Sequence, residues 1–305
     1  MKRRTLRRLG FHVLRGLARV LALGGMGLLR RGGAVFGRLH FALGRAKRRQ
    51  LLAQMEQLLP GAVASGQLKK HLLSAYQVND RAILEILAAY SGAVSPKQVA
   101  DACQLDNTLA LDKALADGKG VVLLGMHMGN GVAMAIALAA RGYPISVVYR
   151  ESNKISPGFF RDGIRLQGID AVGAMPAAAG FRAMVRALRA NRIVFILMDQ
   201  ASKRGGIPVR FLGKELDMPP GPAELARRTH APLVPALLEG VDESWHFRFA
   251  DPIRLDRERP LDEEVKMLAD VMEAHILEHP QWWTWHQRRW RRHPFVHPRP
   301  NPAPD

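Results

Sequence analysis

From Gly118 onward, short apolar runs alternate with longer segments of helical spacing. The runs at 121–124, 145–149, 193–198 and 233–238 have the length of buried strands. Residues 131–141 and 180–190, between these runs, have the spacing of helices, and a further helix is expected after the proline-rich 219–222. This alternation predicts an α/β fold with a central, mostly parallel sheet and helices on both faces.

Helical patterns also flank this region. Residues 46–118 carry apolar side chains three and four positions apart, with breaks at Pro60 and at Ser95-Pro96, and residues 262–278 show an amphipathic helical pattern. The single cysteine, Cys103, excludes a disulfide framework and is expected to be a small core or helix residue. A helical region is therefore expected before the sheet and one helix after it.

The first fifty residues predict a basic amphipathic region. On a helical wheel, Arg4, Arg8, Arg15 and Arg19 fall within about 60° of one another, opposite a side centred on apolar residues. Those apolar residues are Leu6, Leu9, Val13, Leu17 and Val20. The apolar run 20–29 is too short to cross a bilayer, which takes about 20 residues. We expect this region to lie on a membrane surface; a targeting peptide and a solvated or nucleic-acid-binding arm are the alternatives.

Charge is concentrated at the two ends of the chain. The net charge is +18, and residues 1–50 contain 14 Lys or Arg and no Asp or Glu. Residues 286–305 add a net +4, so that 51–285 is neutral. A folded domain that binds nucleic acid usually carries the excess charge itself, so nucleic acid is not an expected partner. We predict a membrane-association region at 1–50, an α/β domain at 51–290 and a Pro/Arg-rich tail at 291–305.

Three polar residues follow predicted strands and are candidates for chemistry: His127, Arg150 and Asp199. In open α/β sheets, ligands bind at the carboxyl ends of the strands. The glycines around His127 lack the spacing of a dinucleotide fingerprint, and the chain has no Walker loop and no Gly-x-Ser-x-Gly elbow. His275 and His279 lack the glutamate that a zincin helix places after its first histidine. We therefore predict no metal and no cofactor.

Several short motifs, in order along the chain, carry a family resemblance. They are His127-Met128-Gly129-Asn130, Val148-Tyr149-Arg150, Met198-Asp199-Gln200, the run 206–214, the run 221–229, and His279-Pro280-Gln281-Trp282 with 285–290. From about residue 50 to 292 the chain resembles the bacterial lipid A biosynthesis acyltransferases, within the lysophospholipid acyltransferase superfamily. The resemblance implies transfer of a fatty acyl group from a thioester of acyl carrier protein or coenzyme A to a hydroxyl or amine of a membrane lipid acceptor. It also implies a peripheral location at the cytoplasmic face of the inner membrane.

The resemblance gives roles to particular residues. His127 would deprotonate the acceptor, which then attacks the thioester directly, and Arg150 with backbone N–H groups of the Gly129–Gly131 turn would stabilise the oxyanion. The arginine pairs 227–228 and 288–289 are typical of solvated faces or of contacts to an anionic headgroup or acidic carrier protein. The expected substrate-binding residues are Gly129, Asn130, Gly131, Glu151, Arg227 and Arg228.

One position departs from the family pattern. The motif is His-x4-Asp/Glu, whereas the fifth residue after His127 is Val132. Loss of the acid from a triad-type system costs about 10⁴ in turnover. We expect Asp199 to replace the missing acid, with Glu151 as second choice. The alternative is an inactive relative that binds acyl chains or lipid as a partner or scaffold. The tryptophans at 282–290 favour core packing over a membrane interface.

Overall fold

The computed structural model describes residues 2–59, 65–151, 155–202, 205–287 and 289–290. The predicted tail, 291–305, lies outside the described residues. The helices are α1 Lys2–Ala22, α2 Gly25–Leu43, α3 Arg45–Leu58, α4 Ser65–Tyr90, α5 Pro96–Asp101, α6 Leu109–Leu115, α7 Gly131–Ala140, α8 Phe159–Leu166, α9 Ala177–Arg189, α10 Gly221–Thr229 and α11 Leu261–Glu278. The strands are β1 Cys103–Asp106, β2 Val121–Gly125, β3 Ile145–Tyr149, β4 Asp170–Gly173, β5 Ile193–Leu197, β6 Ile207–Phe211, β7 Lys214–Met218, β8 Leu233–Gly240 and β9 Trp245–Phe249.

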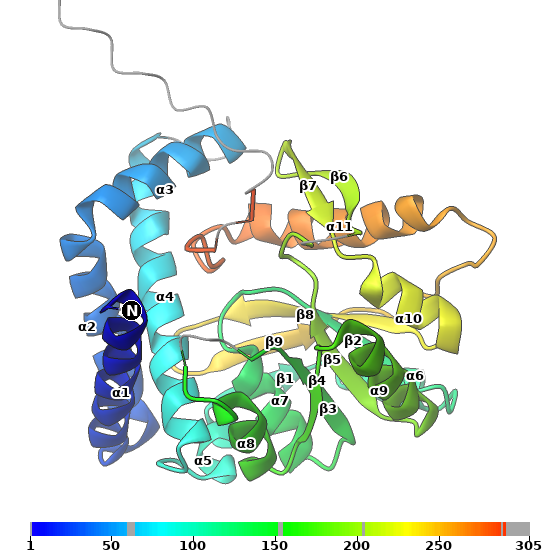
Figure 1. Cartoon of the computed structure of the whole chain (residues 1–305), viewed down its shortest axis with the longest axis horizontal. Coiled ribbons are helices and arrows are strands. Elements are labelled where there is room, and N and C mark those ends of the chain that lie inside the picture. Colours follow the sequence, from blue (N-terminus) through cyan, green and yellow to red (C-terminus); the bar gives the residue numbers. More distant parts are fainter. Residues whose placement is uncertain (1, 60–64, 152–154, 203–204, 288, 291–305) are drawn as a thin grey trace, which may run out of the picture.

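Seven strands form the central sheet, in the order β1-β9-β8-β2-β5-β3-β4. All neighbouring pairs are parallel except β8 and β9, which are antiparallel. Helices α5, α7 and α8 lie on one side of the sheet and α6, α9 and α10 on the other (Figure 1). The prediction of an α/β fold with helices on both faces of a mostly parallel sheet is confirmed. β2 is buried along its whole length at the centre of the sheet, which explains its uninterrupted apolar run.

Some elements were not predicted. Residues 46–118 are not helical throughout, because Cys103 lies in strand β1, where it is 3% exposed. β4, β6, β7 and β9 were also missed. These strands are four or five residues long, and β1, β6 and β9 alternate between buried and exposed side chains. Such short segments are specified by their neighbours in the sheet rather than by their own pattern.

The amino-terminal region is helical, as predicted, and packs on the long helix α4 (Figure 1). Gly33 and Gly37 of α2 permit close approach: a Cβ atom at either position would lie 2.5–2.6 Å from the Cα atom of Arg81 or Gln77. Among the described residues, no helix is long and apolar enough to cross a membrane.

Helix α1 packs mainly through a face other than its predicted apolar side, although Leu17 of that side is partly buried against the core. The buried side chains are Phe11, Ala18 and Ala22, on a different face. Arg15 is partly buried and donates from Nε to the Ser91 hydroxyl at 2.9 Å, so part of the arginine face turns toward the body of the protein. The predicted apolar side, with Leu9, Val13 and Val20, stays 59–64% exposed. α1 therefore presents an apolar stripe that no other part of the described chain covers.

Candidate active site

His127 lies in a tight loop between β2 and α7. The loop turns at Gly129, whose φ of +60° is unfavourable for other residues. A Cβ atom there would lie 2.8 Å from a side-chain carbon of Leu238. Asn130 caps α7 by accepting a hydrogen bond at Oδ1 from the backbone N–H of Ala133 at 3.0 Å. The loop holds His127 at the carboxyl end of a central strand, where its side chain is 24% exposed.

Asp199 lies beside His127, as the sequence analysis predicts. β5, which ends at Leu197, pairs with β2 in parallel, so the residues after the two strands meet at one edge of the sheet. Nδ1 of His127 lies 2.5 Å from Oδ1 of Asp199, and the backbone N–H of His127 donates to Oδ2 at 3.0 Å. A carboxylate at Nδ1 fixes the proton there and leaves Nε2 with the lone pair.

Asp199 is fully buried and charged. Burial raises the pKa of this carboxyl, but the charges of His127 and Arg289 and the hydrogen bonds from His127 lower it further, so that the pKa lies well below its usual value. Nη2 of Arg289 donates to Oδ2 of Asp199 at 2.7 Å, and Nε1 of Trp283 donates to the same atom at 2.9 Å. These charges and hydrogen bonds keep the buried carboxylate ionised without contact with solvent.

The Nε2 side of the imidazole is occupied by a glutamine. Nε2 of Gln200 lies 2.9 Å from Nε2 of His127 and also donates to the side-chain oxygen of Gln287. Donation from the amide suits an imidazole whose Nε2 carries a lone pair. Both glutamines are surface residues, so this is the solvent side of the ring. A substrate hydroxyl that approaches His127 from solvent would take the place of the Gln200 amide.

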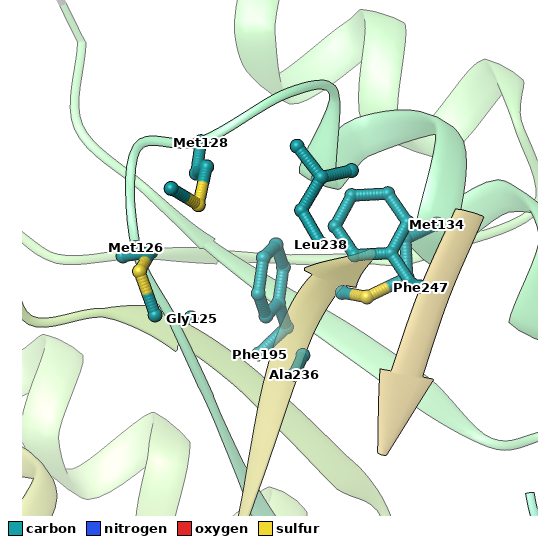
Figure 2. Close-up of a pocket in the computed structure, with 9 residues that line it drawn as sticks. Gly125, Met126, Met128, Met134, Phe195, Ala236, Leu238 and Phe247 are labelled. Carbon is teal, nitrogen blue, oxygen red and sulfur yellow. The ribbon is translucent and has the colours of Figure 1, made fainter. Parts of the chain in front are cut away.

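A small apolar cavity lies next to this loop (Figure 2). Its volume of about 10 Å³ leaves room for about one water molecule. Methionine is an adaptable side chain that repacks readily, and three methionines contribute to the wall. The lining residues are Gly125, Met126, Met128, Gly131, Met134, Phe195, Ala236, Leu238 and Phe247.

The remaining predicted residues occupy other places. Arg150 and Glu151 follow β3, which is separated from β2 by β5, and both are exposed. Asp199, not Glu151, is therefore the carboxylate at His127. Val132 lies in the first turn of α7, partly buried against the core.

Asn130 was predicted to bind substrate, and its side chain is not available for that. It is 2% exposed, and its Nδ2 donates to Oε2 of Glu85 at 3.0 Å while its oxygen caps α7. Glu85 also accepts from Nε of Arg81 at 2.9 Å and from the indole N–H of Trp245. This buried network ties the loop to α4. Gly129 and Gly131 shape the same loop, and only their backbone groups remain available to a ligand.

The arginine pairs differ from expectation. Arg227 bonds to Oε2 of Glu264 at 3.1 Å and to two backbone carbonyls, so it serves helix packing. Arg227 and the exposed Arg228 line an open groove whose lining residues include neither His127 nor Asp199. Arg289 is not on a solvated face: it is 2% exposed and bonded to Asp199. Its predicted partner in the pair, position 288, lies outside the described residues.

Sequence reasoning missed the role of the segment after α11. Trp283 and Trp285 are buried, as the packing interpretation predicts, but Trp283 also contacts the site. The backbone N–H of Thr284 donates to the carbonyl oxygen of His127 at 2.9 Å. The density of aromatic and basic residues at 279–290 was the available signal, although nothing in it indicates a contact with His127 or Asp199.

One group of side chains has the spacing of a metal site. Ligand atoms of His275, Glu278 and His279 lie within 4.8 Å of one another. Nε2 of His275 already bonds to the carbonyl oxygen of Leu238 at 2.9 Å, and the His279 ring stacks on Trp282. These contacts account for both histidines without an ion.

A histidine base backed by a buried carboxylate, at the carboxyl edge of a parallel sheet, is the arrangement of enzymes that activate a hydroxyl or water by general base catalysis. The family model of the bacterial lipid A biosynthesis acyltransferases matches residues 1–292, and the chain belongs to this family.

Proteins similar to this chain include three curated relatives and a solved structure. The phosphatidylinositol mannoside acyltransferases of two Mycobacterium tuberculosis strains are 28% identical over 196 residues, 61% of this chain and 61% of theirs. That of Mycolicibacterium smegmatis is 26% identical over 182 residues, 58% of this chain and 59% of its own. The match thus spans less than two thirds of these relatives. The 1-acyl-sn-glycerophosphate acyltransferase PlsC from Thermotoga maritima has a TM-score of 0.40 and 12% identity over 81% of this chain and 97% of its own, a likeness too low to bear on function.

Proposed function

We propose that this protein transfers a fatty acyl group from a thioester, carried by acyl carrier protein or coenzyme A, to a hydroxyl or amine of a lipid or glycolipid acceptor. Membership of an acyltransferase family and similarity to phosphatidylinositol mannoside acyltransferases support the reaction class. The observation that carries the proposal is the 2.5 Å contact between His127 Nδ1 and the buried Asp199 carboxylate. Asp199 thus provides the carboxylate that the family motif places at position 132, where this chain has Val132.

The reaction runs through His127 in two proton transfers. Nε2 takes the proton of the acceptor hydroxyl as its oxygen attacks the thioester carbonyl. The tetrahedral intermediate then collapses, the carbon–sulfur bond breaks, and the imidazolium returns the proton to the departing thiolate. Asp199 stabilises the imidazolium between these steps. No enzyme nucleophile is acylated.

Backbone groups of the loop suit the same reaction. Backbone N–H groups at the Gly129–Gly131 turn lie at the amino-terminal end of α7, where the helix dipole favours a developing oxyanion. Arg150 is not included in the proposed oxyanion site, because β5 separates its strand from β2. The apolar cavity beside Met126 and Met128 is too small for an acyl chain as it stands, since its volume is about 10 Å³.

We also propose that the protein is held at an anionic membrane surface, at the cytoplasmic face of the inner membrane, by α1 and α2. Each helix has a stripe of exposed apolar side chains four or seven positions apart: Leu9, Val13 and Val20 on α1, and Leu28, Val35, Leu39 and Leu43 on α2. On α2, the exposed Arg38 is next to Leu39 in the chain. Each basic side chain near anionic lipid contributes about 1 kcal/mol.

An inactive relative that serves as a lipid-binding partner is the second candidate, and Val132 is the observation that favours it. Mass spectrometry of lipids from cells with and without the gene separates the two. An acyltransferase leaves a fixed acyl mass difference on its acceptor, whereas a scaffold leaves none. Purified protein supplied with palmitoyl-coenzyme A or palmitoyl-acyl carrier protein then identifies the donor.

A further inference from the structure

The Asp199 carboxylate is held from two sides. Oδ1 faces the imidazole of His127, while Oδ2 accepts from the His127 backbone N–H, the Trp283 indole and the Arg289 guanidinium. His127 and Arg289 are the titratable groups whose charges act on Asp199. The two donors from the C-terminal segment thus occupy the oxygen that does not face the ring.

The C-terminal segment is itself fixed to the His127 loop. Trp283 forms an isolated antiparallel bridge with Met128, next to the hydrogen bond from Thr284 N–H to the His127 carbonyl. Nε of Arg289 donates to the backbone carbonyl of Asp199 at 2.6 Å, and Nη1 donates to that of Thr284 at 2.6 Å. The guanidinium carbon lies 3.7 Å from the centroid of the Trp283 ring. One arginine therefore joins the carboxylate, its backbone and the tryptophan.

We propose that Trp283 and Arg289 are positioning residues for acyl transfer that act through Asp199. They hold Oδ1 of Asp199 on His127, and Arg289 balances the charge of the carboxylate. This inference rests on the proposed function of the His127–Asp199 pair. An ionised, unbalanced carboxylate next to an imidazole favours the imidazolium. A nearby guanidinium opposes that effect, because its positive charge repels the added proton. Balanced in this way, the carboxylate keeps Oδ1 on Nδ1 of His127, and Nε2 stays available as a base.

The test follows the protonation of His127 in the full-length protein. Long-range ¹H–¹⁵N NMR spectra, with the His127 signal assigned by its absence in His127→Ala, give the pH at which the His127–Asp199 pair takes up its proton. In Arg289→Met that midpoint is expected to rise, by less than the roughly 1–3 pH units of an opposite charge in direct contact, because Arg289 acts on the ring through Asp199. Trp283→Phe removes only the indole donor, and we expect a smaller rise in the same direction.

The matched control is Trp285→Phe. Trp285 is equally buried, packs edge-on against Trp283 with ring centroids 4.7 Å apart, and donates its indole hydrogen bond to the Pro280 carbonyl rather than to Asp199. This variant is expected to lower the thermal midpoint and leave the titration unchanged.

A merely structural role gives a different result. If Trp283→Phe and Trp285→Phe lose similar stability and neither moves the titration midpoint, the inference is wrong. Should Arg289→Met fail to fold, Trp283→Phe decides alone, and an unmoved midpoint in that variant overturns the inference. A separate measurement tests the proposed function: if His127→Ala retained acyl transfer, the function would be wrong, whatever the titration shows.

Discussion

Replacement of the Asp199 carboxylate by an amide tests the role of this residue in detail. In Asp199→Asn, the side chain keeps its size, but one of its terminal atoms becomes an amide nitrogen. An amide that donates to Nδ1 leaves the proton on Nε2, so the ring is no longer a base toward the acceptor. In a histidine–aspartate system this change costs about 10⁴ in turnover, which corresponds to about 5.5 kcal/mol.

The same substitution also affects stability. Arg289 is 2% exposed, and without the Asp199 charge it becomes an unpaired buried cation. Breaking a buried pair on one side costs about 3–5 kcal/mol. Turnover must therefore be measured below the unfolding transition of the variant, with a thermal melt recorded on the same preparation. The assay is acyl transfer from the thioester donor to membrane lipid extract, followed by mass spectrometry.

Glu264→Gln is the matched control for this variant. Glu264 is likewise 2% exposed and pairs with an arginine, Arg227, at 3.1 Å, but it has no contact with His127 among the described residues. We expect the control to lose stability and to keep turnover within a few-fold. The reasoning is refuted if Asp199→Asn, when folded, transfers acyl groups as fast as Glu264→Gln does.

Three further outcomes are expected. Val132→Glu should change turnover by no more than a few-fold, because Asp199 already accepts the hydrogen bond from Nδ1–H of His127; a gain of 100-fold or more would contradict this. The double variant Leu39→Ser and Leu43→Ser should sediment less with phosphatidylglycerol vesicles, whereas Leu109→Ser, at a residue exposed elsewhere, should sediment like the wild type. Equal sedimentation of both variants and the wild type would contradict a membrane contact by α2. Burial lowers the pKa of His286 to about 4, so unfolding should become easier as the pH falls from about 6.5 to 4, by up to about 3 kcal/mol. Urea unfolding of His286→Phe should show a smaller loss over this range, and an identical loss would contradict the assignment.

The sequence predicted the site where strand order alone determines proximity. Val121–Gly125 and Ile193–Leu197 have the uninterrupted apolar pattern of central strands, and residues that follow parallel neighbours meet at one edge. The approach of Asp199 to His127 follows from this rule. Arg150 follows a strand too, but the pattern does not indicate that β5 lies between it and β2.

Contacts made by irregular segments could not be predicted in this way. Trp283 and Arg289 reach Asp199 because the chain after α11 folds back over the His127 loop. That path depends on single hydrogen bonds and ring contacts, which have no period in the sequence. The buried state of Asn130 has a similar origin, since Glu85 comes from a helix 45 residues earlier.

The face of α1 that packs on the protein could not be predicted from the sequence, for another reason. Its wheel shows a basic side and an apolar side, and either the apolar side or the small residues between them can face the protein. Phe11 packs edge-on against Phe159 of α8, with ring centroids 5.0 Å apart, and α1 contacts α4, so that Leu9 and Val13 remain exposed. Shape complementarity between helices decided this, and it is not encoded in hydropathy alone.

Acyl transfer by His127→Ala is the most direct test of the central claim. Cells that lack the gene receive either the wild-type chain or the variant at matched protein levels, and their lipids are compared by mass spectrometry. We predict that the wild type restores a lipid species one acyl group heavier than its acceptor and that His127→Ala does not. Because the His127 side chain is partly exposed in a loop, the thermal midpoint of the variant should be close to that of the wild type. Formation of the acylated lipid by His127→Ala at a rate within a few-fold of the wild type would contradict the account.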